Sequence, residues 1–187
     1  FEQLNRLDFV EIAFSIDSVG DNLEYIRWPS KHEKTISNIK EFIKYKNINF
    51  TVVPIFYINN LFYIREILDF WANFIEETNY TKLQIMPSLI SDREYFKLDI
   101  LPNMYKSLLA EQLGNIAEHR LFDMLPGKPD SDGNTTPGES TLINFKNLIR
   151  DISLFAQSST ENLPAFLKYL DETARWDVLT GTTMELG

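Results

Sequence analysis

Phe9-Val-Glu-Ile-Ala-Phe-Ser-Ile-Asp17, continued by Ser18-Val-Gly-Asp-Asn-Leu-Glu-Tyr-Ile-Arg27-Trp-Pro29, is the stretch that decides the fold. Its apolar positions are largely aromatic or β-branched, which favours a strand with both faces mostly covered, as in a parallel sheet. Ser15, Asp17 and Ser18 then fall at the carboxyl end of the strand, where parallel sheets hold their ligands. The same residue types also form turns for purely local reasons, so a turn remains the simpler interpretation.

Two further strand patterns follow, and a helix pattern comes after each of the three strands. The strands are expected over 49–58, with a bend or end near Pro54, and over 82–88. The helices are expected over 36–46, over 61–75 with Asn59 or Asn60 as the N-cap, and from Pro102 to Ile116. This alternation predicts right-handed βαβ connections and a parallel sheet.

The pattern changes near the end of the chain, and we divide the sequence into three parts. Residues 1–124 form the strand and helix unit, and 125–140 form a linker rich in Pro, Gly, Asp, Asn and Thr. Residues 141–187 form a helical extension, in which Asn162 is expected to cap the last helix.

Composition excludes several classes of function. The chain has 187 residues and a net charge of −9, which disfavours non-specific nucleic-acid binding and anionic lipid. It has no cysteine, and therefore no thiolate to attack a substrate or to hold zinc or an iron–sulfur cluster. No apolar run is long enough to span a bilayer, so we expect no membrane association and a cytoplasmic location. Because the chain opens on Phe1 close to a core strand, we interpret it as a truncation or domain cut.

Other sets of reactive residues are weaker candidates. His32 and His119 lie next to glutamates on helix faces that should be solvated, and neither has a second histidine at metal-ligand spacing. No metal site is therefore expected. A barrel hydrolase using Asp17 and Glu24 is a further hypothesis, for which the sequence offers no supporting pair.

The motifs on successive strand ends resemble the radical S-adenosylmethionine enzymes, especially the members with a reduced C-terminal twitch extension. The matching segments, which cover about 1–120, are Ser15-Ile-Asp17, Glu24-Tyr-Ile-Arg27-Trp-Pro29, Val53-Pro-Ile-Phe-Tyr-Ile-Asn-Asn60, Ile85-Met-Pro87 and Tyr95-Phe-Lys-Leu-Asp-Ile-Leu-Pro102. The resemblance implies an α/β fold in which residues 1–124 are the C-terminal half of a partial (β/α) barrel with parallel strands, followed by helices.

The resemblance also implies a ligand and its contacts. S-adenosylmethionine would lie across the carboxyl ends of the strands, with Ser15 and Asp17 towards its ribose and amino-acid moiety. Arg27 would pair with the methionyl carboxylate, to which a guanidinium fork is suited. Asn59, and the backbone at Met86 and Pro87, would line the nucleoside, and a small-molecule or peptide substrate would sit near residues 91–99.

One departure from the family is large. Its chemistry needs three cysteines in a CxxxCxxC loop that holds a [4Fe–4S] cluster, and this chain has none. The resemblance then implies that the cluster belongs to a missing N-terminal half of the same enzyme, and that this chain is inactive alone. The alternative is a non-catalytic α/β module that binds a small molecule or a protein.

Overall fold

The computed structural model describes residues 3, 6–90, 98–125, 137–157 and 162–181. Within these ranges, β1 (Val10–Phe14), β2 (Ile48–Val52) and β4 (Gln84–Ile85) form an open sheet in the order β1-β2-β4. A second small sheet pairs β3 (Ile55–Phe56) with β5 (Ser88–Leu89). All of these pairs are parallel, which confirms the α/β class with a parallel sheet, whereas the strands of the described part do not close into a barrel.

Prolines explain why two of the predicted strands are each divided in two. Pro54 separates β2 from β3, and Pro87 separates β4 from β5, at matching places in the ladder. Proline has no N–H to donate to a neighbouring strand, so regular pairing stops at each position. Pairing then resumes, with the Ser88 N–H donating to the Pro54 carbonyl at 3.0 Å. The strand was predicted to bend or end near Pro54, and its end there is confirmed.

The helices partly match the predicted ranges. They are α1 (Gly20–Ile26), α2 (His32–Phe42), α3 (Ile64–Thr78), α4 (Asn103–Leu113), α5 (Leu121–Met124), α6 (Pro137–Ala156) and α7 (Leu163–Thr180). Three-residue 3₁₀ turns also occur: η2 (Leu61–Tyr63), η4 (Leu98–Ile100) and η5 (Ile116–Glu118). The predicted ranges contain no helix between β1 and residue 36, whereas α1 lies in this stretch and α2 already begins at His32. Residues 126–136 of the predicted linker lie outside the described residues, and α6 begins within the remainder of its range.

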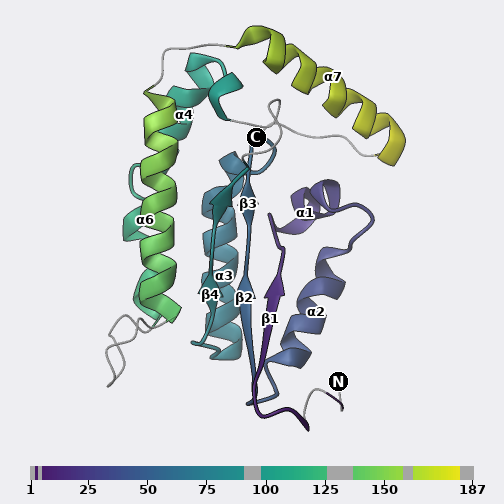
Figure 1. Cartoon of the computed structure of the whole chain (residues 1–187), viewed down its shortest axis with the longest axis vertical. Coiled ribbons are helices and arrows are strands. Elements are labelled where there is room, and N and C mark those ends of the chain that lie inside the picture. Colours follow the sequence, from purple (N-terminus) through teal and green to yellow (C-terminus); the bar gives the residue numbers. More distant parts are fainter. Residues whose placement is uncertain (1–2, 4–5, 91–97, 126–136, 158–161, 182–187) are drawn as a thin grey trace.

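The core lies between one face of the larger sheet and the helices α2 and α3 (Figure 1). Phe50 on β2 is buried, with its ring stacked 4.9 Å from that of Tyr80 and 6.4 Å from that of Trp71 on α3. The apolar residues of α3 recur at helical spacing, so Ile67, Leu68 and Trp71 all face the sheet and are fully buried.

The other face of β1 is exposed, which corrects the prediction that this strand is covered on both faces. Glu11, Ala13 and Ser15 alternate with partly buried residues and are exposed. On β2, the Thr51 hydroxyl lies 3.5 Å from the carboxylate of Glu11 and 3.5 Å from the amide oxygen of Gln84. This face of the sheet is therefore polar. Figure 1 shows α3 behind the sheet and no described helix in front of β1. β1 is thus an edge strand with one open polar face.

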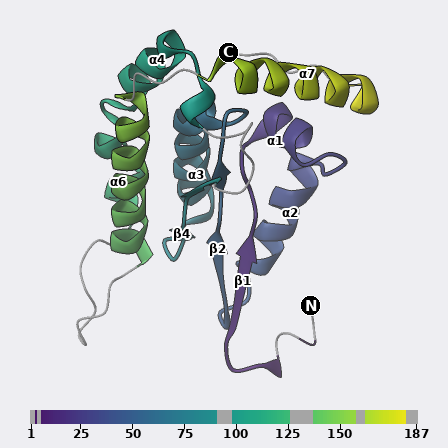
Figure 2. The ribbon, with the colours of Figure 1, turned by 45° about the horizontal axis from the view of Figure 1, so that its top comes forward.

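The two C-terminal helices close off the sheet at its edge and at its end. At the edge of β4, the Ile85 N–H donates to Thr141 Oγ1 at 2.9 Å, and Gln84 Nε2 donates to Ser140 Oγ at 3.1 Å. The first turn of α6 therefore takes the place of another strand beside β4. Figure 2 shows α7 crossing the carboxyl end of the sheet above α1. Within the described ranges, no helix is both long and apolar enough to cross a membrane.

Replacing Phe50 by alanine tests this account of the core. We expect Phe50→Ala to lower the free energy of unfolding by about 3–5 kcal/mol, because it removes a buried ring and leaves a cavity. Phe9→Ala is the matched control, since Phe9 is 61% exposed, and it should change stability by less than about 0.5 kcal/mol. Urea unfolding measures both values, and equal effects would contradict this description of the core.

Candidate functional site

The predicted site centres on the carboxylate of Asp17, which lies just beyond β1 and is 3% exposed. Its Oδ2 accepts a hydrogen bond from Arg27 Nε at 2.6 Å. Its Oδ1 accepts one from the backbone N–H of Ile55, the first residue of β3, at 2.9 Å. A buried charge is tolerated when it is paired and hydrogen-bonded, and both oxygens of Asp17 meet that condition. The carboxylate therefore fixes Arg27 against the end of the sheet.

Arg27 joins this buried pair to solvent. It directly follows α1, and its side chain is 39% exposed. Among the described residues, the guanidinium makes a hydrogen bond only through Nε, which donates to Asp17. The terminal Nη1 and Nη2 groups thus remain for an anion, and the fork geometry suits a carboxylate or phosphate.

Asn60 is a central residue of this site and, as one of the two predicted cap residues, occupies the N-cap position of η2, the turn that leads into α3. Neither it nor Asn59 caps the following helix through its side chain. Instead, Asn60 Nδ2 donates to the backbone carbonyls of Asp17 at 2.7 Å and of Ile55 at 2.8 Å. Its Oδ1 accepts from the Tyr57 N–H at 2.8 Å. Asn60 is fully buried and ties the end of β1 to the β3 segment.

Two buried polar atoms beside this network have no partner among the described residues. Ser18 is fully buried, and its Oγ makes no hydrogen bond there. Asn22 donates through Nδ2 to the Asn59 carbonyl at 3.3 Å, but its buried Oδ1 also lacks a partner in the described part. A buried polar group left unsatisfied costs about 1–3 kcal/mol. A water molecule or a polar ligand group at this position would remove that cost.

The structure divides the six predicted site residues into two groups. Asp17, Arg27 and Asn59 lie at the buried end of β1 and in the segment after β3. Side chains alternate between the two faces along a strand, which places Ser15 and Met86 on the open face. Pro87 directly follows Met86 in the sequence. Ser15 is exposed and Met86 is 45% exposed. No hydrogen bond between described residues joins the two groups through their side chains.

Helix α7 covers part of this region and was not predicted to do so. The Tyr25 hydroxyl donates to Asp177 Oδ1 at 2.8 Å, and Trp176 Nε1 donates to the Tyr25 carbonyl at 3.3 Å. The Trp176 ring also meets the Trp28 ring edge-on, at 6.4 Å between centroids. These contacts join α1 to a helix about 150 positions away in the sequence. No local pattern carries that information, although the aromatic residues on both segments are a weak signal.

Three tyrosines around this end of the sheet have raised pKa values. Burial raises the pKa of Tyr169, which is 1% exposed, to about 12. Burial also raises the pKa of Tyr57, with a further contribution from the negative charge of Asp17. For Tyr25, burial and then the hydrogen bond to Asp177 raise the pKa. All three therefore carry their protons at neutral pH, as neutral hydroxyls.

The structure gives no support to a hydrolase built on Asp17 and Glu24. Glu24 accepts hydrogen bonds from Lys31 Nζ at 2.5 Å and from the His32 N–H at 3.1 Å. The hydrogen bond from Lys31 is the main cause of the lowered pKa of Glu24. A general acid needs a raised pKa, and Asp17 is already held by Arg27. The two carboxylates are therefore bound to separate cations.

The histidines are less solvated than predicted. His119 is 9% exposed, and its Nε2 lies 3.2 Å from Asp69 Oδ1. His32 packs against Phe70 with 5.1 Å between ring centroids, and burial lowers its pKa. Within the described residues, no group of histidine, aspartate and glutamate side chains could hold a metal ion.

Comparisons with protein-family models, curated proteins and solved structures find no significant match to this chain.

Replacing Asp17 by asparagine tests the buried ion pair. Asp17→Asn removes the charge that holds Arg27, and we expect it to lower the free energy of unfolding by about 1–3 kcal/mol. The control Asp8→Asn removes an exposed carboxylate and should change stability by less than about 0.5 kcal/mol. Urea unfolding at neutral pH and low salt distinguishes them. An Asp17→Asn variant as stable as the control would show that the pair does not support the fold.

The tyrosines predict a loss of stability at high pH. The folded state keeps the Tyr169 proton up to about pH 12, whereas an unfolded tyrosine loses it near pH 10. Stability from this group is thus fully present below about pH 10 and is lost as the pH rises through about 12. Unfolding free energies measured across this window should fall less steeply for Tyr169→Phe than for the parent chain. Equal slopes would contradict the raised pKa.

Proposed function

We propose that the chain is the C-terminal portion of a radical S-adenosylmethionine enzyme and that it binds S-adenosylmethionine and substrate. The observation that carries the proposal is Arg27, a half-exposed guanidinium held by buried Asp17 at the carboxyl end of β1. S-adenosylmethionine carries a carboxylate on its methionyl part, which is the kind of group that the free side of Arg27 would bind. The unpartnered hydroxyl of Ser18 and the buried Asn59 beside it would then face polar parts of the same ligand.

The iron–sulfur cluster of this enzyme class does not fit the residues present. The chain has no cysteine, and its described part has no other group of side chains that could hold a metal. In the proposed enzyme, a preceding N-terminal portion would hold the [4Fe–4S] cluster and supply the electron. The residues of this chain would position the cosubstrate, whose 5′-deoxyadenosyl radical abstracts a hydrogen atom from the substrate.

The open side of β1 supports the idea of a preceding portion. β1 is the outer strand of its sheet, and one face of it is exposed and polar. The backbone groups of Glu11, Ala13 and Ser15 alternate with those that pair to β2, so they point to the edge that no described strand covers. Another parallel strand placed there would extend the sheet towards the partial barrel that the proposal implies.

A non-catalytic α/β binding module is the second candidate. It is favoured by the position of α7, which lies across the carboxyl end of the sheet and bonds to α1 through Asp177 and Trp176. A module of this kind would bind a small anion through Arg27, or a protein through the same end, without any cluster.

The test uses the full-length protein, reconstituted without oxygen from iron and sulfide. We expect it to bind S-adenosylmethionine and to release 5′-deoxyadenosine after reduction. Arg27→Ala should weaken S-adenosylmethionine binding by about tenfold or more, since it removes a charged hydrogen-bonding group. Arg65→Ala is the matched control, because Arg65 is an exposed arginine on α3.

Two results would overturn the proposal. The first is a coding sequence upstream of Phe1 that lacks a strand followed by CxxxCxxC. The second is S-adenosylmethionine binding that is equal in Arg27→Ala and the parent protein, which would remove the role of Arg27. Anion binding through Arg27 without 5′-deoxyadenosine formation would favour the second candidate.

A further inference from the structure

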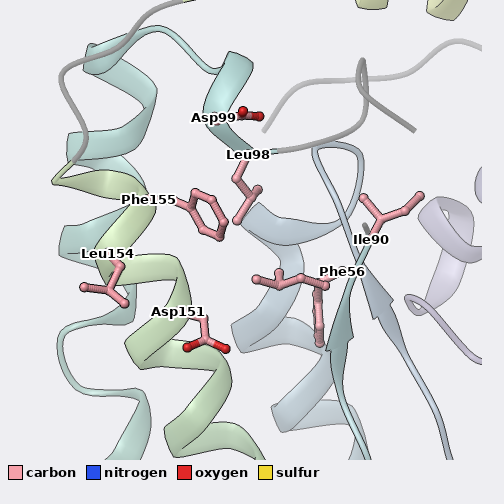
Figure 3. A pocket seen from close by; sticks show the side chains of 8 residues that line it. Phe56, Ile90, Leu98, Asp99, Asp151, Leu154 and Phe155 are labelled. Atoms are coloured by element: carbon pink, nitrogen blue, oxygen red, sulfur yellow. The ribbon is translucent and has the colours of Figure 1, made fainter. Parts of the chain in front are cut away.

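A cavity of about 500 Å³ lies between α6, η4 and the carboxyl ends of β3 and β5, apart from the Arg27 site. Figure 3 shows the lining side chains, which come from these separate elements. The lining residues are Phe56, Leu89, Ile90, Leu98, Asp99, Asp151, Leu154 and Phe155. The volume is in the range that holds a small organic molecule.

The walls of this cavity are apolar, and the exceptions are two carboxylates. Phe56 is fully buried at its base, and Leu98 and Phe155 face each other in Figure 3, with Asp99 and Asp151 at opposite ends of this view. Among the described residues, the lining includes no lysine, arginine or histidine. The charge that these lining residues present to a ligand is therefore negative.

Of the two carboxylates, Asp99 is the one that can accept a further hydrogen bond. Its Oδ1 is buried and has no hydrogen-bond partner among the described residues. Asp151 differs, because its Oδ1 accepts from Arg150 Nε at 3.2 Å and from Arg150 Nη2 at 3.1 Å. A carboxylate accepts hydrogen bonds but cannot donate them, so the missing partner of Asp99 must be a donor. In apolar surroundings a cationic donor is the most favourable one.

We propose that this cavity binds a small molecule with an apolar body and a protonated amine, with the amine donating to Asp99. The apolar body lies against Leu98 and Phe155, and an aromatic ring suits the neighbouring phenylalanine rings. An anionic ligand is disfavoured by both carboxylates and by the net charge of −9. Leu98 and Asp99 fall in the stretch 91–99 where the resemblance places the substrate, but none of the lining residues belongs to the Arg27 site. Amine binding can therefore be tested without S-adenosylmethionine.

The test titrates the whole chain, labelled with ¹⁵N, with 2-phenylethylammonium and with two neutral or anionic analogues, 2-phenylethanol and 3-phenylpropionate. We expect amide shifts centred on Ile90, Leu98 and Phe155. The amine should bind about tenfold more tightly than the alcohol, the size expected of one charged hydrogen bond. Equal affinities for the three probes, or shifts centred elsewhere, would overturn the proposal.

Variants separate the role of Asp99 from a general effect of charge. Asp99→Asn should bring the amine and the alcohol to within about twofold of each other, whereas Glu33→Gln, which removes an exposed carboxylate on α2, should leave the difference unchanged. Leu154→Lys adds a cation at the rim, where Leu154 is 62% exposed, so the fold should tolerate it. It should weaken amine binding and spare the alcohol. Amine affinity unchanged in both Asp99→Asn and Leu154→Lys would refute the site.

Discussion

The end of the sheet depends on one buried carboxylate. Asp17 accepts from Arg27 Nε at 2.6 Å and from the Ile55 N–H at 2.9 Å, so it joins the end of β1 to the residue after α1 and to the start of β3. Asn60 adds a second connection through the Asp17 and Ile55 carbonyls. Because both carboxylate oxygens are occupied, Asp17 acts on any ligand through Arg27, which it orients. The same interactions that hold these segments together therefore also define the site.

Patterns decided by nearby residues were predictable. The strands of the larger sheet follow from apolar side chains, and the interruption at Pro54 follows from the missing N–H of proline. Asn162 caps α7 as predicted, because its Oδ1 accepts from the Ala165 N–H only three positions away. In each of these cases, the physical cause lies within one turn or one strand of the residue concerned.

Features decided by distant residues were not predictable. Asn60 has the side chain of a helix cap, but one of its partners is the carbonyl of Asp17, 43 positions away in the sequence. The exposed face of β1 was missed because Ala13 and Ser15 are small enough for either environment. The contact of Tyr25 with Asp177 spans 152 positions, and neither residue type indicates the other. Sequence reasoning therefore located the strand end but not the side chains that enclose it.

The pattern of burial also limits how a ligand can approach. Tyr25 and Tyr169 are buried at the end crossed by α7, and Asp17 and Ser18 are buried beside them. The accessible members of the predicted set are Ser15 and Met86 on the open sheet face and Arg27 at the strand end. These three side chains are accessible while α7 stays in place, whereas reaching the buried Ser18 Oγ requires a gap in the cover. α7 is held to α1 by polar and aromatic contacts and also carries the buried Tyr169, so opening that gap costs these contacts and the burial of the Tyr169 ring.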